Sequence, residues 1–209
     1  NYFKFPQKMI ESFINFDHKL FVIINQTLSS TSLDGIMSFL SSKWMFMPIY
    51  IIAVFKMVQI FKKRFWMPVL LCLLAFGLAD SISSKIFKPA FKRVRPAFCE
   101  TMNPRLPDGK PGGHYGFVSS HAANTFAVYP LFVVLLFSQY SKNTRTLITN
   151  RKYIIIAFLV SGLVAYSRVY NGVHWPADVF FGGLLGLLIC YFCVQIWKNW
   201  LMVKALNEN

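Results

Sequence analysis

One polar cluster lies between two strongly apolar stretches, in the segment SRVYNGVHWPAD that runs from Ser167 to Asp178. Charged side chains at membrane depth are costly, so they usually face a cavity and have a chemical role. His174 and Asp178 are four residues apart, so a helix that begins by Trp175 lets the carboxylate reach the imidazole. A carboxylate bound to one ring nitrogen makes the other nitrogen a better base or nucleophile. The segment therefore predicts an oriented histidine beside a cation, Arg168.

A second histidine stands in GFVSSHAANTF, where a polar start precedes an apolar stretch. Ser119 and Ser120 are expected at the first turn of a helix, and His121 and Asn124 share one of its faces. Backbone amides and hydroxyls at a helix N-terminus bind anions. Ordinary capping by either serine, with His121 merely hydrogen-bonded, explains the segment equally well when it is taken alone.

A third segment, DSISSKIFKPAFKRVRP, is strongly basic. Asp80, Ser84 and Lys88 are spaced by four and are expected to form one polar stripe along a helix. One or two lysines at a helix end can be explained as long side chains that extend to the membrane surface. That explanation does not cover a basic run that reaches Arg95 and adjoins a polar stripe along the helix. Four cations crowd the outer end of this helix: Lys88, Lys92, Arg93 and Arg95.

Composition places these segments in a bilayer. Of 209 residues, 55% are hydrophobic and 22 are Phe, more apolar surface than a soluble domain of this size can bury. The expected fold is an all-α polytopic membrane bundle with about five transmembrane helices, each needing about 20 mostly apolar residues. Five stretches qualify: Trp44 to Phe61, Phe65 to Phe87, Val118 to Phe137, Tyr153 to Tyr170, and Pro176 to Trp197.

The N-terminal region differs from the rest of the chain. Apolar residues recur there at helical spacing among polar ones, which predicts an amphipathic helix in the membrane interface: Phe13, Phe16, Leu20, Phe21 and Ile24. The segment from Asn25 to Asp34 is too rich in Ser, Thr and Asn to span a bilayer. We therefore expect an interfacial segment over residues 1–43 and a transmembrane domain over residues 44–204.

The alternation of spans brings the three polar segments to one side of the membrane. The second and fourth spans end on that side, and the third and fifth spans begin there. A cationic clamp of this kind suits a phosphate whose charge must be stabilised during transfer. The combined site holds three cations, two histidines and one orienting carboxylate: Lys88, Arg95, Arg168, His121, His174 and Asp178.

The net charge of +14 is distributed in a way that predicts the orientation. Placing the Lys62–Arg64 turn, the Lys142–Lys152 turn and the C-terminal end in the cytoplasm satisfies the positive-inside rule. The site then faces the periplasmic side of the cytoplasmic membrane. Its own cations break the rule, which they need not obey if they have a functional partner. This distribution does not favour nucleic acid, and no obligatory protein partner is expected.

Together the three motifs resemble the type 2 phosphatidic acid phosphatase superfamily. Lys88 to Pro96 reads K-x6-R-P, Ser119 to His121 reads S-x-H, and Ser167 to Asp178 reads S-R-x5-H-x3-D. The resemblance extends from Phe65 to Trp197. The superfamily includes polyprenyl-diphosphate phosphatases, phosphatidylglycerophosphate phosphatases, lipid A phosphatases and vanadium haloperoxidases. One motif departs from the pattern, because the usual P-S-G-H is replaced by VSSH, with Ser120 where the family has glycine.

The resemblance implies a two-step hydrolysis without metal or cofactor. His174, oriented by Asp178, attacks phosphorus and forms a phosphohistidine. His121 protonates the departing lipid oxygen and then activates water. The resemblance assigns the phosphoryl oxygens to five residues: Lys88, Arg95, Ser119, Ser120 and Arg168.

Three other functions are each compatible with some of these residues. Zinc could be ligated by His121, His174 and Asp178, but the three cations would repel a divalent metal. An anion channel or transporter needs a polar path across the membrane, whereas Val128–Phe137 and Leu184–Cys193 are nearly devoid of charge. A haloperoxidase would share the pocket, but those relatives are soluble.

The sequence leaves the substrate open among polyprenyl diphosphate, lipid A, phosphatidylglycerophosphate and phosphatidic acid. The loop ETMNPRLPDGKPGGHYG carries Arg105, Lys110 and His114 on a Gly- and Pro-rich segment. These residues could meet a second phosphate, although solvated surface charge explains each of them alone. On this basis the sequence favours a polyprenyl, that is undecaprenyl, diphosphate.

Overall fold

A computed structural model describes residues 7–138 and 151–207 of the chain. The described residues are helical apart from turns, loops and one isolated bridge between Val94 and Tyr115. Lys142 and Arg145, two of the cations whose distribution predicts the orientation, lie outside these residues.

Five helices in the described part are long and apolar enough to cross a membrane. α4 continues through a π-helical turn, Ile82–Phe87, into the short α5, Lys88–Phe91, so the second span reaches Phe91. The spans are formed by α3 (Lys43–Phe61), α4 (Trp66–Ser81) with its extension, α6 (Ser120–Ser138), α8 (Arg151–Tyr170) and α9 (Pro176–Asn207). The all-α membrane bundle expected from the sequence is confirmed.

The largest differences in helix bounds lie at the ends of the second and last spans. α9 runs ten residues beyond Trp197, and the second span runs four residues beyond Phe87. Both extensions carry basic residues, which hydropathy excludes from a span although the helical backbone continues. Hydrophobic length therefore predicts where the chain is buried in lipid, not where its helices stop.

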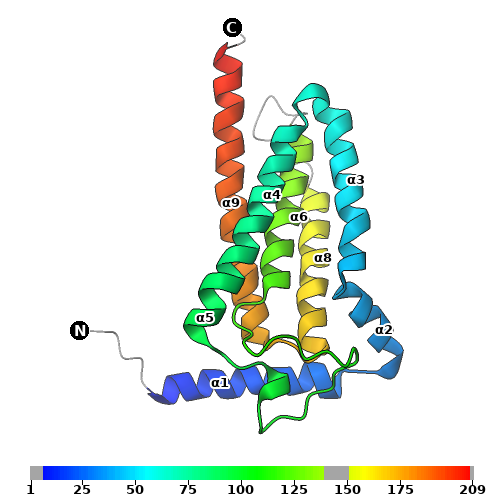
Figure 1. The fold of residues 1–209 in the computed structure, drawn as a ribbon, viewed down its shortest axis with the longest axis vertical. Helices are drawn as coiled ribbons and strands as arrows, with labels where there is room; N and C mark the ends of the chain where they lie inside the picture. Colours follow the sequence, from blue (N-terminus) through cyan, green and yellow to red (C-terminus); the bar gives the residue numbers. More distant parts are fainter. Residues whose placement is uncertain (1–6, 139–150, 208–209) are drawn as a thin grey trace, which may run out of the picture.

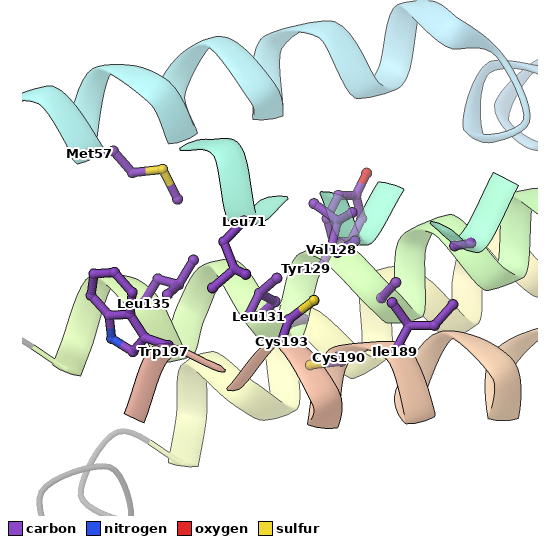
Figure 2. Packing of buried hydrophobic residues seen from close by; sticks show 14 of the residues in the cluster. Met57, Leu71, Val128, Tyr129, Leu131, Leu135, Ile189, Cys190, Cys193 and Trp197 are labelled. Atoms are coloured by element: carbon purple, nitrogen blue, oxygen red, sulfur yellow. The ribbon is translucent and has the colours of Figure 1, made fainter. Parts of the chain in front are cut away.

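α6 lies at the centre of the bundle, with α3, α4, α8 and α9 around it (Figure 1). Its contact with α9 is close because Gly182 and Gly186 present no side chain to it. A Cβ on Gly182 would lie 2.6 Å from the Ser119 carbonyl oxygen, and one on Gly186 would overlap the Ala123 carbonyl. Figure 2 shows part of the apolar core of the bundle, built from side chains such as Met57, Leu131 and Trp197.

The N-terminal region forms two helices, α1 (Gln7–Val22) and α2 (Thr31–Leu40), joined through a π-helical turn, Ile23–Thr27. α1 lies across one end of the bundle, at a steep angle to the spans (Figure 1). Phe13 and Phe16 are exposed on it, whereas Asp17 and Phe21 are buried against the protein. A helix therefore forms where the sequence predicts an amphipathic one, with apolar side chains exposed on one side. Its place in the membrane interface stays a prediction.

Candidate active site

Four helix ends gather at the end of the bundle that α1 crosses (Figure 1). α5 ends the second span there, α8 ends there, and α6 and α9 begin there. The loop that follows α5 lies at the same end (Figure 1). The three polar segments identified in the sequence therefore share one end of the molecule, as the alternation of spans predicts.

His174 and Asp178 are in contact at the start of α9. Nδ1 of His174 lies 3.3 Å from Oδ2 of Asp178, and both side chains are buried. α9 begins at Pro176, one residue after the latest start expected from the sequence, Trp175. The contact still forms because the amide of Trp175 donates to the same Oδ2 at 3.1 Å and holds the carboxylate toward the preceding loop.

Asp178 is also held by a chain of charges outside the sequence motifs. Its Oδ1 accepts a hydrogen bond from Nη1 of Arg93 at 2.7 Å. Nη2 of the same guanidinium binds one carboxylate oxygen of Asp17 in α1, and the other accepts the amide of Ala177 at 2.8 Å. The guanidinium lies 5.4 Å from the centre of the Trp175 ring. Arg93 and Asp17 are therefore positioning residues for the carboxylate that contacts His174.

The sequence motifs do not identify Asp17 as a site residue, and they include Arg93 only as part of a basic run. A signal for Asp17 was present, because it stands four residues from Phe21 and four from Phe13, within the apolar stripe of the amphipathic helix. A lone carboxylate on such a stripe needs a partner. The partner itself is more than 70 residues away in sequence, and no local pattern identifies it.

The π-helical turn after α4 changes which serine reaches the site. Ser83 is buried, and its hydroxyl donates to Oγ of Ser120 at 2.8 Å. Ser84 donates instead to the backbone carbonyl of Asp80 at 2.6 Å. A π turn rotates the following side chains away from α-helical spacing. The predicted stripe is therefore wrong at Ser84, whereas Lys88 does reach the site and donates to Ser120 Oγ at 3.0 Å.

His121 occupies the first turn of α6, on the side that faces α2 and α3. Its ring hydrogen-bonds the backbone of Ser41, which follows α2, and lies 6.1 Å from the ring of Phe46. Arg168 and His174 are near enough to interact with it electrostatically. The structure thus brings both histidines to one site and holds each through a different part of the N-terminal region.

Arg95 is 7% exposed and is tied to the loop that covers it. Its Nε donates to the carbonyl of Tyr115 at 3.2 Å, and its amide donates to the carbonyl of His114 at 3.1 Å. Gly112, at φ +76°, allows the guanidinium to pass, because a Cβ there would overlap Nη1. The loop therefore fixes Arg95 from several directions.

Two buried polar atoms at the site have no hydrogen-bond partner in the described part of the chain, Nε of Arg168 and Oγ of Ser119. The amide of Ser119 is already used, since it donates to the Asp178 carbonyl at 2.9 Å. Unpartnered buried donors are costly and rare in folded proteins. An anion placed beside His174 would supply acceptors to both.

The charge around His174 favours its neutral form. Burial lowers the pKa of His174 well below its usual value, and Arg95, Arg168 and Lys88 lower it further. The Gly116 backbone, which hydrogen-bonds the ring, opposes this shift. A neutral imidazole with Nδ1 directed at a carboxylate keeps a lone pair on Nε2. The ring is therefore prepared to act as a nucleophile or base near neutral pH.

Two of the loop residues expected to meet a second phosphate, Arg105 and His114, contact other parts of the protein instead. Nη2 of Arg105 forms an ion pair with Asp34 at 2.9 Å, and its backbone amide donates to Asn25. His114 packs its ring against Phe98, with the ring centres 5.1 Å apart. Arg105 therefore ties the loop to the N-terminal region, which removes one of the three residues on which the preference for a diphosphate depended.

Gly116→Ala is expected to lower kcat/KM by about 10- to 100-fold, as small displacements of catalytic groups do. A Cβ at this position would lie 2.7 Å from Oδ2 of Asp178 and 3.0 Å from Cγ of Arg95. Gly113→Ala is the matched control, because a Cβ there meets nothing within 4 Å. Steady-state kinetics in detergent checks this expectation. Equal activity of the two variants would contradict the described packing around Asp178.

The sequence model of the PAP2 superfamily matches residues 65–202. A lipid A 4'-phosphatase from Porphyromonas gingivalis is 29% identical over 198 residues, covering 90% of this chain and 75% of that protein. An undecaprenyl-diphosphatase from Sulfolobus acidocaldarius is 32% identical over 193 residues, covering 89% of this chain and 81% of that protein.

The fold also matches a solved structure. The crystal structure of a transmembrane PAP2-type phosphatidylglycerolphosphate phosphatase from Bacillus subtilis superposes with a TM-score of 0.68 at 26% sequence identity. The match covers 91% of this chain and 87% of that one. The helical arrangement, including the N-terminal region that precedes the matched family segment, is therefore shared with a membrane phosphatase.

Proposed function

This chain belongs to the PAP2 superfamily of phosphatases, and from this premise we propose that it removes phosphate from a membrane lipid through a phosphohistidine on His174. The observation that carries the proposal is the pairing of a buried, neutral His174 with Asp178 at 3.3 Å, beside three cations. Neutral imidazole is the nucleophilic form, and the cations stabilise charge on the phosphoryl oxygens.

In the first step, Nε2 of His174 forms a bond to phosphorus as the bond from phosphorus to the lipid oxygen breaks. The leaving oxygen takes a proton from His121, so that a lipid alcohol departs from a phosphomonoester, or a lipid monophosphate from a diphosphate. In the second step, His121 accepts a proton from water, the water oxygen bonds to phosphorus, and the bond to Nε2 breaks. Inorganic phosphate is released and both histidines return to their starting states.

The phosphoryl oxygens are assigned to Lys88, Arg95, Ser119, Ser120 and Arg168. The unpartnered Nε of Arg168 and Oγ of Ser119 support this assignment. Ser120 stands where the family has glycine, and its hydroxyl is bound by Lys88 and Ser83. Its side chain thus positions the lysine ammonium instead of filling an empty pocket.

A groove in the bundle supports a lipid as the leaving group. One cavity lies beside Ser120 and His121, with Phe46, Tyr50 and Phe76 on its walls. A second, almost wholly apolar cavity shares Tyr50 and Phe76 with the first and continues along α3, α4 and α6. The hydrocarbon chain of a bound lipid can therefore extend from the phosphate site into the apolar cavity, within the plane of the membrane. A water-soluble substrate has no apolar chain to bury there.

The relatives named above act on lipid A and undecaprenyl diphosphate, and the sequence favours the diphosphate. Purified protein should be assayed in detergent for phosphate release from undecaprenyl diphosphate, phosphatidylglycerophosphate, phosphatidate and lipid A. Turnover of at least one lipid, inhibition by vanadate and retained activity in excess chelator are expected. Loss of activity in chelator that zinc restores would contradict the phosphohistidine mechanism and favour a metal site at His121, His174 and Asp178.

We also propose that the site opens on the periplasmic side of the cytoplasmic membrane. Cys99 lies in the loop at the site end, whereas Cys190 and Cys193 are buried in the core. An impermeant thiol reagent applied to spheroplasts is therefore expected to label the wild type and not Cys99→Ser. Labelling that requires permeabilisation of the cytoplasmic membrane would reverse the orientation.

The pH at which kcat/KM falls on the acidic side of its pH profile should depend on the cations around His174. Its lowered pKa keeps the ring neutral at pH 6.5, so activity that depends on the neutral ring is lost only below that pH. Arg95→Gln removes one of the cations that lower this pKa, so this fall should move to higher pH. The kcat/KM of the variant should be divided by that of the wild type at each pH. Because the substrate titrates identically in both assays, its own pH dependence cancels in this ratio. A ratio constant between pH 4.5 and 7.5 would contradict this coupling.

A further inference from the structure

Two polar side chains that the proposed reaction does not use face the cavity beside the phosphate site. Asp80 and Asn124 line this cavity together with Ser120 and His121. Oδ1 of Asn124 is buried without a hydrogen-bond partner in the described part of the chain. The Asp80 carboxylate likewise accepts no hydrogen bond and forms no ion pair within residues 7–138 and 151–207; its backbone carbonyl alone is used, by Ser83 and Ser84.

These two groups lie on the membrane side of the phosphate site. Asp80 precedes Lys88 by two helical turns in the second span, and Asn124 follows Ser120 by one turn in α6. Both helices run between the site end and the opposite end of the bundle (Figure 1), so both groups lie deeper than the Lys88–Ser120 contact. The leaving group of a bound lipid must pass this point before its chain enters the apolar groove.

We propose that Asp80 and Asn124 recognise a hydrogen-bond donor on the leaving group, a hydroxyl or an N–H close to the phosphorylated carbon. A carboxylate is acceptor-only, and the unpartnered Asn124 oxygen is a second acceptor in the same cavity. A charged or polar residue at membrane depth is retained where it contacts a substrate. The inference rests on the proposed phosphatase activity and names its substrate class: phosphomonoesters of glycerol or sugar headgroups.

This substrate class differs from the diphosphate that the sequence favours. When the terminal phosphate of a diphosphate is removed, the leaving group is itself a phosphate anion. A carboxylate on the leaving-group side would repel that anion, whereas it would bind a neutral hydroxyl. The ion pair of Arg105 with Asp34 acts in the same direction, because it withdraws a cation from any second phosphate.

A counter-ion role for Asp80 is the alternative explanation. Asp80 does interact electrostatically with Lys88, but the Lys88 ammonium is hydrogen-bonded to Ser120 at 3.0 Å, and no ion pair between Asp80 and Lys88 forms within 4.0 Å among the described residues. A counter-ion would affect every phosphate substrate equally. A recognition role affects only those substrates that carry the donor, and this difference can be measured.

The test compares 1-oleoyl-glycerol 3-phosphate, which has a free hydroxyl beside the phosphorylated carbon, with its 2-deoxy analogue. The wild type is expected to prefer the hydroxyl substrate in kcat/KM by about 10- to 100-fold, the range for a hydrogen bond to a charged group. Asp80→Asn and Asn124→Leu should each reduce this preference at least several-fold. Asp80→Asn should also raise kcat/KM for farnesyl diphosphate, because a charge that repels its leaving group is gone.

Thr125→Val is the matched control. Thr125 lines the same cavity, but its hydroxyl already donates to the carbonyls of His121 and Ala122, so its loss should leave the preference unchanged. Equal rates of the wild type on the two substrates would overturn the inference, as would an equal slowing of both by Asp80→Asn. Failure of the proposed function itself would look different, since the wild type would then release no phosphate from either compound.

Discussion

His174→Ala is expected to abolish phosphate release from every substrate, because no covalent intermediate can form without the nucleophile. The residual rate should fall to that of detergent micelles without enzyme, a loss of at least about 10⁴-fold when nucleophilic attack and general acid catalysis act as a unit. Steady-state assays on a lipid phosphate and on an aryl phosphate measure it. His174→Asn, which keeps polarity but no nucleophilic nitrogen, should fail equally.

His121→Ala should behave differently on the same two substrates. General acid catalysis contributes about 10²–10⁴-fold, and a stable phenolate leaving group makes much of it unnecessary. The variant should therefore be severely impaired on the lipid phosphate and recover in part on the aryl phosphate, at least for formation of the intermediate. A pre-steady-state burst of phenolate would reveal this step even if the later attack of water is slow.

Equal failure of both histidine variants on both substrates, with folding intact, would contradict this division of roles. Recovery of His174→Ala in place of His121→Ala would mean that the roles are reversed. Because Asp178 lies against His174, and the ring of His121 instead hydrogen-bonds the Ser41 backbone, the structure favours the assignment made here.

Arg168→Lys is expected to lower kcat by about 10²–10³-fold, the range for removing one preorganised donor from a site of charge development. Arg168 is held at the end of α8, and its Nε has no partner in the described part of the protein. A lysine keeps the charge but cannot reproduce the planar donor geometry, so charge alone should not restore the rate.

Arg151→Lys, at the exposed start of the same helix, is the matched control and should keep full activity. The inhibition constant of vanadate should rise for Arg168→Lys in step with the loss of kcat/KM, because vanadate resembles the pentacoordinate phosphorus of the reaction. A variant that loses only stability would show normal kinetics per folded molecule. That result would show that Arg168 does not contact the phosphoryl group.

The sequence predicted the membrane spans and the gathering of the three motifs well, and the reason is physical. A span must hide about 20 residues of backbone from lipid, so hydrophobic length alone identifies it. Once the spans are known, their alternation decides which ends meet. His121, His174 and Lys88 could therefore be brought together without knowledge of any contact between helices.

Contacts from the N-terminal region could not be predicted in this way. Asp17 and Ser41 belong to segments that lie across or beside the site end, and neither segment follows the alternation of spans. The π-helical turn was also invisible, because nothing in the residues Ile82–Phe87 requires an extra residue per turn. Because of this turn, Ser83 and not Ser84 contacts Ser120, whereas Lys88 contacts Ser120 as well.

Trapping the covalent intermediate tests the central proposal most directly. The enzyme would be mixed with a lipid phosphate carrying ³²P in the phosphoryl group, quenched within milliseconds in base and analysed as peptides by mass spectrometry. With a ³²P-labelled aryl phosphate, on which its first step is less impaired, His121→Ala should accumulate the species, because its second step lacks a base to activate water. We expect an acid-labile, base-stable phosphate on His174. Full turnover with no trapped phosphate, or a phosphate on another residue, would contradict it.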